Sequence, residues 1–378
     1  MREPVAATPV RVPFGSLDHD YRKRRDAIDS AILRVLAGGR FILGEEVAAF
    51  ERELALYVGV ARTVGCASGT DAIALGLLAA GVRADDEVLL PANACVPVAA
   101  GVRLTGARPR LADVDSDTLT LGRAEAERAA TPRVRFLLAV HLYGGVADVE
   151  GLRELARETG RILVEDCAQS LGASANGGKA GSFGAAAAFS FYPTKNLGAY
   201  GDAGAVATGD PELARRVERL RQYGWSRRDY SEVEGRNSRM DELQAAVLRA
   251  KLPSLESDNA RRREIAKRYD DAFARLPLAM LRRRPGSLPA PHLYPVRTPA
   301  RAELARHLSS RGVETAIHYP VPLHLQPAYA FLGHRRGDFP VSEDACETVL
   351  SLPMYPTLSD AQLDVVVSGV REFFEDVT

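Results

Sequence analysis

The sequence predicts an α/β protein with a mainly parallel central sheet in a large domain, followed by a smaller C-terminal α/β domain. Between Thr63 and residue 209, short apolar runs alternate with helical segments, which is typical of βαβ units and of a buried parallel sheet. The strand pattern then stops, and residues 211–275 have a helical pattern. A chain of 378 residues is also long enough for two domains.

The expected elements follow one another along the first half of the chain. Residues 1–20 read as an irregular N-terminal arm, and helical patterns follow from about Tyr21 to Ala37 and from Glu46 to Val58. The apolar runs that predict strands are TVGCAS, EVLLPA, RPRLADVD, RFLLAVHLYG, RILVEDCAQS, AAAAFSFYP and GAVATG. We therefore place the large domain at residues 21–254.

The second half of the chain predicts the small domain, at residues 255–378. A long helical run from Met240 through Ile265 is interrupted near Pro253, and the pattern becomes mixed after Pro285 with the segments LYPVRT and ETAIHYP. The last helix begins at Asp360 and has one apolar face, formed by Leu363, Val366, Val367, Val370 and Phe374.

Composition excludes several classes of protein. Because 49 basic side chains balance 49 acidic ones, no long-range field attracts nucleic acid or an anionic membrane, and a small-molecule partner is expected. The 4 cysteines are widely spaced without a CxxC or Cys/His cluster, so we expect no metal site and no disulfide framework. No apolar run reaches about 18 residues. We expect a cytoplasmic protein with reduced thiols.

A carboxylate at the end of one predicted strand is the first candidate for chemistry. In RILVEDCAQS the apolar run ends at Glu165 and Asp166, at the carboxyl edge where open α/β sheets form their ligand crevice. A carboxylate there can hold a ring nitrogen protonated. The competing interpretation is a helix cap or a loop acid.

A lysine in the loop after another predicted strand is the second candidate. FSFYPTKNLGAYGDAGAVAT places Lys195 between two apolar strands, five residues after Ser190, among glycines that let the backbone approach a ligand. Most lysines are solvated surface charges, so Lys195 by itself is weak evidence for a catalytic lysine. Ser190 can reach a phosphate oxygen.

The segment CASGTDAIAL supplies a third candidate. Gly69 and Thr70 end a strand and start a helix, so free backbone N–H groups face the crevice and can seat a phosphate, although a simple helix cap explains the pattern equally well. Together the three segments are stronger evidence for a cofactor site than each is alone. Pyridoxal 5'-phosphate needs a phosphate-binding site, a carboxylate for its ring nitrogen and a lysine that forms a Schiff base.

Five motifs in this order resemble the DegT/DnrJ/StrS aminotransferases, which act mainly on nucleotide-linked keto sugars. They are SGTDAIAL, VEDCAQSLGA, FSFYPTKNLGAYGDAGAV, GRNSRMDELQAA and IHYPVPLH, and the resemblance runs from about residue 35 to 376. It implies the type I fold of aspartate aminotransferase and a homodimer with shared active sites. It also implies a role in amino-sugar and deoxysugar biosynthesis, for an antibiotic or a polysaccharide.

The resemblance assigns a role to each matching position. Lys195 carries the cofactor as a Schiff base, Asp166 pairs with the pyridine nitrogen, and Gln169 lies near the ring hydroxyl. Asn237 matches an asparagine that reaches the phosphate of the neighbouring subunit, and Arg239 braces that loop on the substrate side. The phosphate-binding positions match Gly69, Thr70 and Ser190.

One cofactor position departs from the family pattern. Where many relatives have an aromatic residue stacked on the pyridine ring, PANACVPVA has Cys95, so ring stacking must be weaker or come from elsewhere. A small buried hydrophobe is the favoured interpretation of Cys95 over a redox role.

Substrate contacts are expected from two further segments. By resemblance, His318 and Tyr319 of IHYPVPLH lie near the sugar-nucleotide diphosphate, whereas His324 caps or packs. Tyr223, within RQYGWSRRDY, belongs to an aromatic and cationic rim for a nucleotide, for which an exposed helix end is the alternative. His141 lies at a strand end and could approach the substrate, with packing as its alternative role.

The resemblance implies ping-pong transamination from L-glutamate or L-glutamine, with pyridoxamine 5'-phosphate formed in the half reaction. The expected acceptor is a dTDP-linked 3-keto-6-deoxyhexose, giving a dTDP-3-amino-3,6-dideoxyhexose. A 4-keto sugar or a scyllo-inosose-type cyclitol would use the same machinery. Lys195 argues against the related dehydratases, which have histidine there, and a noncatalytic regulatory homologue should have lost Asp166, Lys195 or Asn237.

Overall fold

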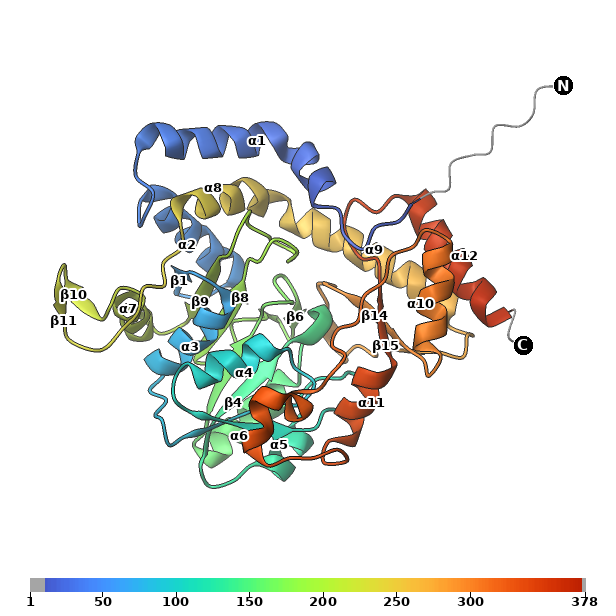
Figure 1. Cartoon of the computed structure of the whole chain (residues 1–378). Coiled ribbons are helices and arrows are strands. Elements are labelled where there is room, and N and C mark those ends of the chain that lie inside the picture. Colours follow the sequence, from blue (N-terminus) through green and yellow to red (C-terminus); the bar gives the residue numbers. More distant parts are fainter. Residues whose placement is uncertain (1–10, 376–378) are drawn as a thin grey trace.

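The alternating apolar runs form one sheet of seven strands in the computed structural model, which describes residues 11–375 (Figure 1). The strands are β1 (Arg62–Cys66), β2 (Glu87–Pro91), β3 (Arg108–Ala112), β4 (Val134–Val140), β5 (Ile162–Asp166), β8 (Ala186–Ser190) and β9 (Gly204–Thr208). Their order is β1-β9-β8-β5-β4-β2-β3, in which β9 is antiparallel to both neighbours and every other pair is parallel. The predicted mainly parallel sheet is confirmed.

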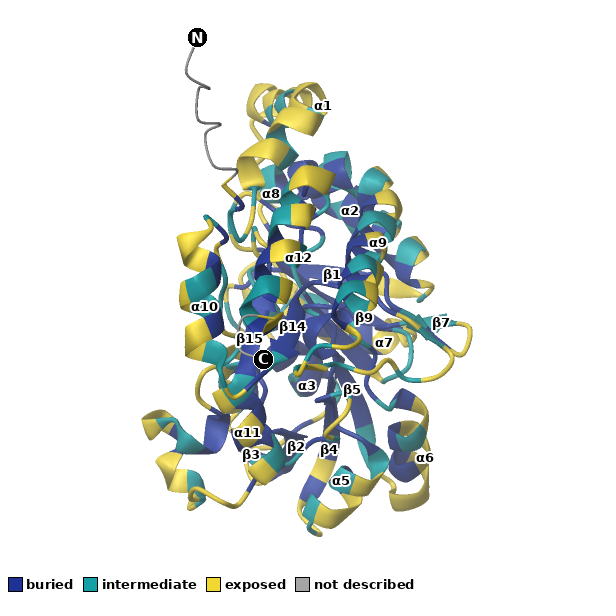
Figure 2. Ribbon diagram, turned by 90° about the vertical axis from the view of Figure 1, so that its right-hand side faces the viewer, coloured by how far each residue is buried: buried dark blue, intermediate teal, exposed yellow. Residues whose placement is uncertain are grey.

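Helices cover both faces of this sheet, so its strands are apolar on both sides (Figure 2). One face packs against α3 (Gly69–Ala79), α4 (Val96–Arg103) and α7 (Pro211–Leu220). The opposite face packs against α2 (Glu45–Val58), α5 (Arg123–Ala129), α6 (Val149–Thr159) and α8 (Glu242–Lys251). Helix α1 (Leu17–Gly38) lies against α8 at the rim (Figure 1).

The C-terminal region begins with α9 (Leu255–Phe273), separated from α8 by the turn η2 (Leu252–Ser254) at the predicted interruption. Its antiparallel sheet contains β12 (Ala279–Met280), β14 (Tyr294–Arg297) and β15 (Val349–Leu352). Around this sheet lie α10 (Arg301–Ser310), α11 (Pro340–Thr348) and α12 (Asp360–Glu375). The apolar face predicted for α12 is confirmed, because Leu363, Val366, Val370 and Phe374 are buried and Val367 packs against the same core.

Short elements join the two regions. A small sheet is formed by β6 (Ser174–Ala175), β7 (Gly178–Lys179) and β13 (Ser287–Leu288). The 3-10 turns are η1 (Leu142–Gly144), η3 (Leu323–Leu325) and η4 (Pro327–Leu332). Among residues 11–375, no helix is both long and apolar enough to cross a membrane. The division into an arm and two domains stays a prediction.

Three local expectations are wrong. Residues 221–241 are not helical but contain the hairpin of β10 (Trp225–Arg227) and β11 (Tyr230–Ser231). Gly224 has φ +75°, and a Cβ there would lie 1.7 Å from the Val233 carbonyl oxygen, so the close approach of the two hairpin arms overrides helix propensity. Helix α1 begins at Leu17 rather than near Tyr21. The segment ETAIHYP makes only an isolated bridge, between Ala316 and Ser351.

Candidate active site

Asp166 is the last residue of β5, and its side chain is buried at the carboxyl edge of the sheet. Its Oδ1 accepts a hydrogen bond from the Ala168 N–H at 2.9 Å. Burial raises the pKa of the carboxyl, and the Ala168 hydrogen bond and the Lys195 charge oppose this effect. No lysine or arginine of residues 11–375 forms an ion pair with Asp166. The carboxylate can therefore accept a cationic N–H group from a ligand.

Lys195 lies in the loop between β8 and β9, where its backbone N–H donates to the Tyr192 carbonyl at 2.8 Å. Burial lowers the pKa of the Lys195 ammonium, and the charge of Asp166 partly restores it. Within the described chain, no carboxylate pairs with Nζ. A lysine with a lowered pKa and no acidic partner is suited to act as a nucleophile and a base.

The predicted phosphate seat lies at the start of α3. Ser68 caps this helix by accepting a hydrogen bond from the Asp71 N–H at 3.1 Å, so helix α3 begins at Gly69. A Cβ on Gly69 would lie 2.5 Å from the Ser190 Cβ, which shows that the two residues touch. The start of helix α3 and the Ser190 side chain are therefore adjacent, and backbone N–H groups at a helix start beside a hydroxyl suit an anion.

Gln169, Tyr319 and Cys95 form a linked wall beside Asp166. The Tyr143 N–H donates to Gln169 Oε1 at 2.7 Å, and Gln169 Nε2 donates to the Tyr319 hydroxyl at 3.0 Å. The Tyr319 hydroxyl also interacts with the Cys95 thiol. Burial raises the pKa of Cys95 to about 11, so the thiol is protonated at neutral pH and presents a small neutral surface.

His318 is brought to the same site from the C-terminal region. Its ring stacks on Phe14 with 5.6 Å between centroids, and Nδ1 lies 3.0 Å from Ser351 Oγ. Burial and then the Lys195 charge lower the pKa of His318 to about 4. His318 is therefore neutral at physiological pH, beside the lysine.

A cavity of about 350 Å³ opens beside Lys195 and is lined by residues from both regions of the chain. Sequence reasoning missed most of its lining residues, among them Phe14, Asn196, Arg262 and His292. Asn196 could have been found from its place next to Lys195. No sequence pattern singles out Arg262, because RRREIAKR is typical of a solvated helix face.

Of the predicted site residues, Lys195 and His318 line this cavity. The others do not line it, and these are Gly69, Thr70, Cys95, Asp166, Gln169, Ser190, Tyr223, Asn237, Arg239 and Tyr319. Asn237, Tyr223 and Arg239 lie on the segment between α7 and α8, outside the residues around Lys195. Asn237 and Tyr223 are exposed, and the Tyr223 ring lies 5.2 Å from the ring of Trp225. Their contact with cofactor or substrate stays a prediction that requires a second copy of the chain.

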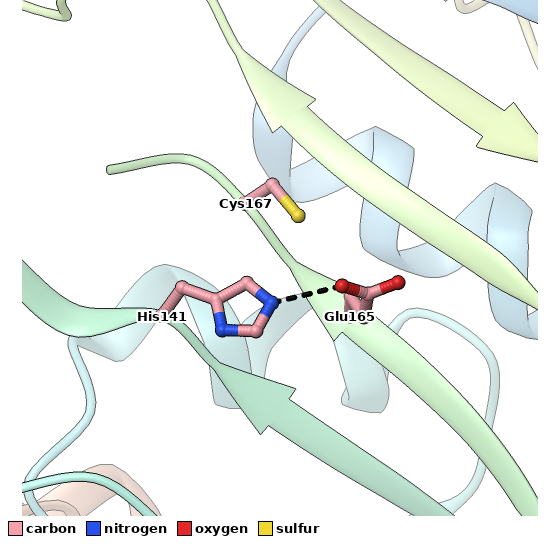
Figure 3. Close-up of side chains that lie close together, drawn as sticks. All are labelled: His141, Glu165 and Cys167. Atoms are coloured by element: carbon pink, nitrogen blue, oxygen red, sulfur yellow. Dashed lines mark hydrogen bonds and ion pairs between the residues drawn. The ribbon is translucent and has the colours of Figure 1, made fainter. Parts of the chain in front are cut away.

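His141, Glu165 and Cys167 form a buried cluster at the ends of β4 and β5 (Figure 3). His141 Nε2 lies 2.9 Å from Glu165 Oε2, while Nδ1 accepts a hydrogen bond from the Ala147 N–H at 3.0 Å. The two Glu165 oxygens also accept three backbone N–H groups of residues 181–184. Because these hydrogen bonds use the ring nitrogens and carboxylate oxygens, the cluster holds the loop to β5 rather than a metal.

The second histidine for which packing was expected is also structural. His324 is buried and its Nε2 lies 2.8 Å from Glu343 Oε1. Like His141, it ties two chain segments together and does not line the cavity beside Lys195.

Comparison with known proteins agrees with this arrangement. Residues 23–371 match the DegT/DnrJ/EryC1/StrS aminotransferase family. The chain is 47% identical over 374 residues to the dTDP-3-amino-3,4,6-trideoxy-alpha-D-glucose transaminase of Streptomyces venezuelae, covering 98% of each protein. The S. venezuelae DesV crystal structure has a TM-score of 0.95 at 46% identity, covering 97% of this chain and 99% of that one. NtdA of Bacillus subtilis, solved with bound cofactor PMP, has a TM-score of 0.91 at 30% identity, covering 98% and 87%.

Proposed function

The chain belongs to the DegT/DnrJ/EryC1/StrS family of aminotransferases, and we propose that its acceptor is a dTDP-linked 3-keto-6-deoxyhexose. The amino donor in this proposal is L-glutamate or L-glutamine, and the product is a dTDP-3-amino-3,6-dideoxyhexose. The observation that carries the choice of sugar is the near full-length similarity to the dTDP-3-amino sugar transaminase of S. venezuelae.

The residues of the site fit pyridoxal 5'-phosphate, the cofactor of this aminotransferase. Asp166 offers a buried carboxylate without a cationic partner among residues 11–375, as a protonated pyridine nitrogen requires. The contact between Gly69 and Ser190 leaves no room for a Cβ, which supports the proposal that the two residues bind the phosphate. When bound, the cofactor supplies an electron-poor ring that takes up the electron pair left on the substrate carbon after proton removal.

The protein's own groups then perform the proton transfers. Lys195 Nζ binds the cofactor between turnovers and, once displaced by the donor's amino group, accepts the proton from the donor's α-carbon. With the cofactor bound, Lys195 Nζ would deliver this proton to C4', and the second half reaction would reverse the transfers on the keto sugar. Asp166 keeps the ring nitrogen protonated throughout, since its carboxylate lies in a low-dielectric setting.

A homodimer with shared sites is part of the proposal. Exposed apolar side chains gather on α1 and directly after it, at Leu33, Leu36, Phe41 and Ile42, which supports a further protein surface there. Asn237 is exposed and lies outside the cavity of its own chain, so it is free to reach the phosphate of a second copy. Tyr223 and Arg239 would reach the nucleotide in the same way.

A reducing, cytoplasmic location also belongs to the proposal. The cysteines Cys66, Cys95, Cys167 and Cys346 are all unpaired, and three of them are buried. A protein with four free thiols does not need an oxidising compartment to fold.

The deciding experiment offers L-glutamate with the 3-keto or the 4-keto dTDP-6-deoxyhexose and locates the new nitrogen by NMR. The 3-keto sugar without a 4-hydroxyl is included, because the S. venezuelae relative is named for a 3,4,6-trideoxy sugar. Amination only at C4, or only of a cyclitol ketone, would remove the 3-amino assignment. Lys195→Ala serves as the inactive control and should abolish turnover while the protein stays folded.

The same assay separates an enzyme from a noncatalytic regulatory homologue. Wild-type protein that binds the cofactor but never converts it with L-glutamate, L-glutamine or other amino acids would favour the regulatory alternative. Asp166, Lys195 and Asn237, which such a homologue is expected to lose, are all present.

A further inference from the structure

Arg262 of α9 is a buried cation without an anionic partner. Its side chain is almost fully buried, and Nη1 donates to the backbone carbonyls of Pro291, His292 and Met354, at 2.7 Å in the last case. Among residues 11–375, Nε and Nη2 have no hydrogen-bond acceptor, and no carboxylate forms an ion pair with the guanidinium. Burial lowers the pKa of Arg262 to about 10. A buried charge of this kind is costly unless an anion compensates it.

Arg262 shares its cavity with Lys195. Both side chains line the same space of about 350 Å³, together with His292. The His292 carbonyl accepts a hydrogen bond from Arg262 Nη1, and its ring Nδ1 lies 3.2 Å from the Asn196 amide oxygen next to Lys195. The unpaired guanidinium therefore faces the space that leads to the reactive amine.

The acidic residues of this cavity are already neutralised. Asp20 pairs with Arg24 and, at 2.8 Å, with Lys251. Asp258 pairs with Arg24 and, at 3.3 Å, with Lys23. The histidines of the cavity, His292 and His318, both have lowered pKa values and are neutral at physiological pH. Arg262 therefore has no ion-paired carboxylate of its own among residues 11–375, although the charges of Asp258 and Asp20 partly oppose the lowering of its pKa.

We propose that Arg262 binds a carboxylate of the amino-acid donor, so that the cavity beside Lys195 is the donor's subsite. Nη1 is held by backbone carbonyls and Nη2 has no acceptor among residues 11–375, so Nη2 can donate a charge-assisted hydrogen bond to a carboxylate. The proposal rests on the transamination proposed above and adds a binding residue to it.

The two half reactions test this assignment separately. In one, cofactor-loaded enzyme is mixed with L-glutamate and the absorbance of the bound cofactor is followed. In the other, enzyme loaded with pyridoxamine 5'-phosphate is mixed with the keto sugar. Arg262→Lys and Arg262→Gln should lower the second-order rate constant for L-glutamate by about 30-fold or more, as loss of a buried charged contact does. The sugar half reaction should change by less than about threefold.

A binding measurement gives a readout without turnover. Glutarate has the carboxylates of L-glutamate but no amino group, so it cannot react. Calorimetry should detect glutarate binding to the wild-type holoenzyme and weaker binding to both Arg262 variants. The matched control is Arg268→Gln, which removes an exposed arginine of the same helix that pairs with Asp360 and Asp364. It should behave as the wild type.

Each outcome decides the proposal. A loss with L-alanine as well as L-glutamate assigns Arg262 to the α-carboxylate, and a loss with L-glutamate alone assigns it to the distal carboxylate. Equal loss in both half reactions, loss with the sugar only, or no loss overturns the proposal. Should Arg262→Gln not fold, Arg262→Lys decides by the same two half reactions, because it keeps the charge but loses the geometry of the guanidinium. If L-glutamate converts the wild type but no keto sugar accepts the amino group, the sugar assignment fails and Arg262 is still tested.

Discussion

Replacing Glu165 by glutamine tests how much the hydrogen bonds of the buried His141–Glu165 pair stabilise the protein. The substitution keeps the size of the side chain but exchanges one acceptor oxygen for an NH2 donor. Glu165 Oε1 accepts from the Phe183 and Gly184 N–H groups, both at 2.8 Å. Oε2 accepts from the Gly181 N–H at 2.9 Å and faces His141 Nε2 at 2.9 Å. Whichever oxygen is replaced, two donors lose their acceptor.

His141 cannot relieve this conflict by moving its proton. Its Nδ1 already accepts the Ala147 N–H, so Nε2 must remain the protonated nitrogen. Two charge-assisted hydrogen bonds at roughly 1.5–3 kcal/mol each give an expected loss of about 3–6 kcal/mol in the free energy of unfolding. No cavity contributes, because glutamate and glutamine have nearly the same volume.

Urea unfolding followed by fluorescence and circular dichroism measures this loss. Glu150→Gln is the matched control, since Glu150 is exposed and accepts only from Asn176 Nδ2, and it should change stability by less than about 0.5 kcal/mol. A loss below about 1 kcal/mol for Glu165→Gln would refute the reasoning. It would mean that the cluster relaxes and does not fix the loop of residues 181–184.

Gly69→Ala should lower cofactor affinity about tenfold or more in equilibrium dialysis, because its Cβ would lie 2.5 Å from the Ser190 Cβ. Gly38→Ala, whose Cβ would meet nothing within 4 Å, should leave the affinity unchanged. The pKa of His318 is lowered to about 4, so the unfolded chain takes up this proton first and stability should fall as pH drops from about 6.5 to 4. His318→Gln should weaken that dependence in urea unfolding at several pH values, and an unchanged dependence would contradict it. Burial raises the pKa of Asp166 above its ordinary value of 3.8. The protonated carboxyl is favoured in the folded protein, so cofactor-free protein loses stability as pH rises from about 3.8 through the raised pKa. Asp166→Asn should therefore stabilise cofactor-free protein at pH 7 while lowering turnover about 100-fold, and a destabilised variant would show that the carboxylate is not strained.

The central sheet and the reactive residues on its edge could be predicted because their signals are local. A buried parallel strand must be apolar on both faces, so RFLLAV and RILVED show the strands β4 and β5 directly. Because parallel strands end at one edge, Asp166 and Lys195 were expected to meet, and the charge of each perturbs the pKa of the other. Gly69 and Ser190 were likewise brought together as expected.

The tertiary structure alone decided which charges are buried and which loops turn back. Arg262 sits in an arginine-rich helix whose sequence reads as solvated, and only the packing of α9 against the segments around Pro291 and Met354 removes it from water. The hairpin before α8 depends on the close approach of Gly224 to Val233, which no local propensity encodes. Phe14 reaches the cavity because Val12 pairs with Val313, about three hundred residues away in the chain. The sequence determined the reactive pair through short-range patterns, whereas burial and long-range contacts, which depend on the whole fold, determined the walls around it.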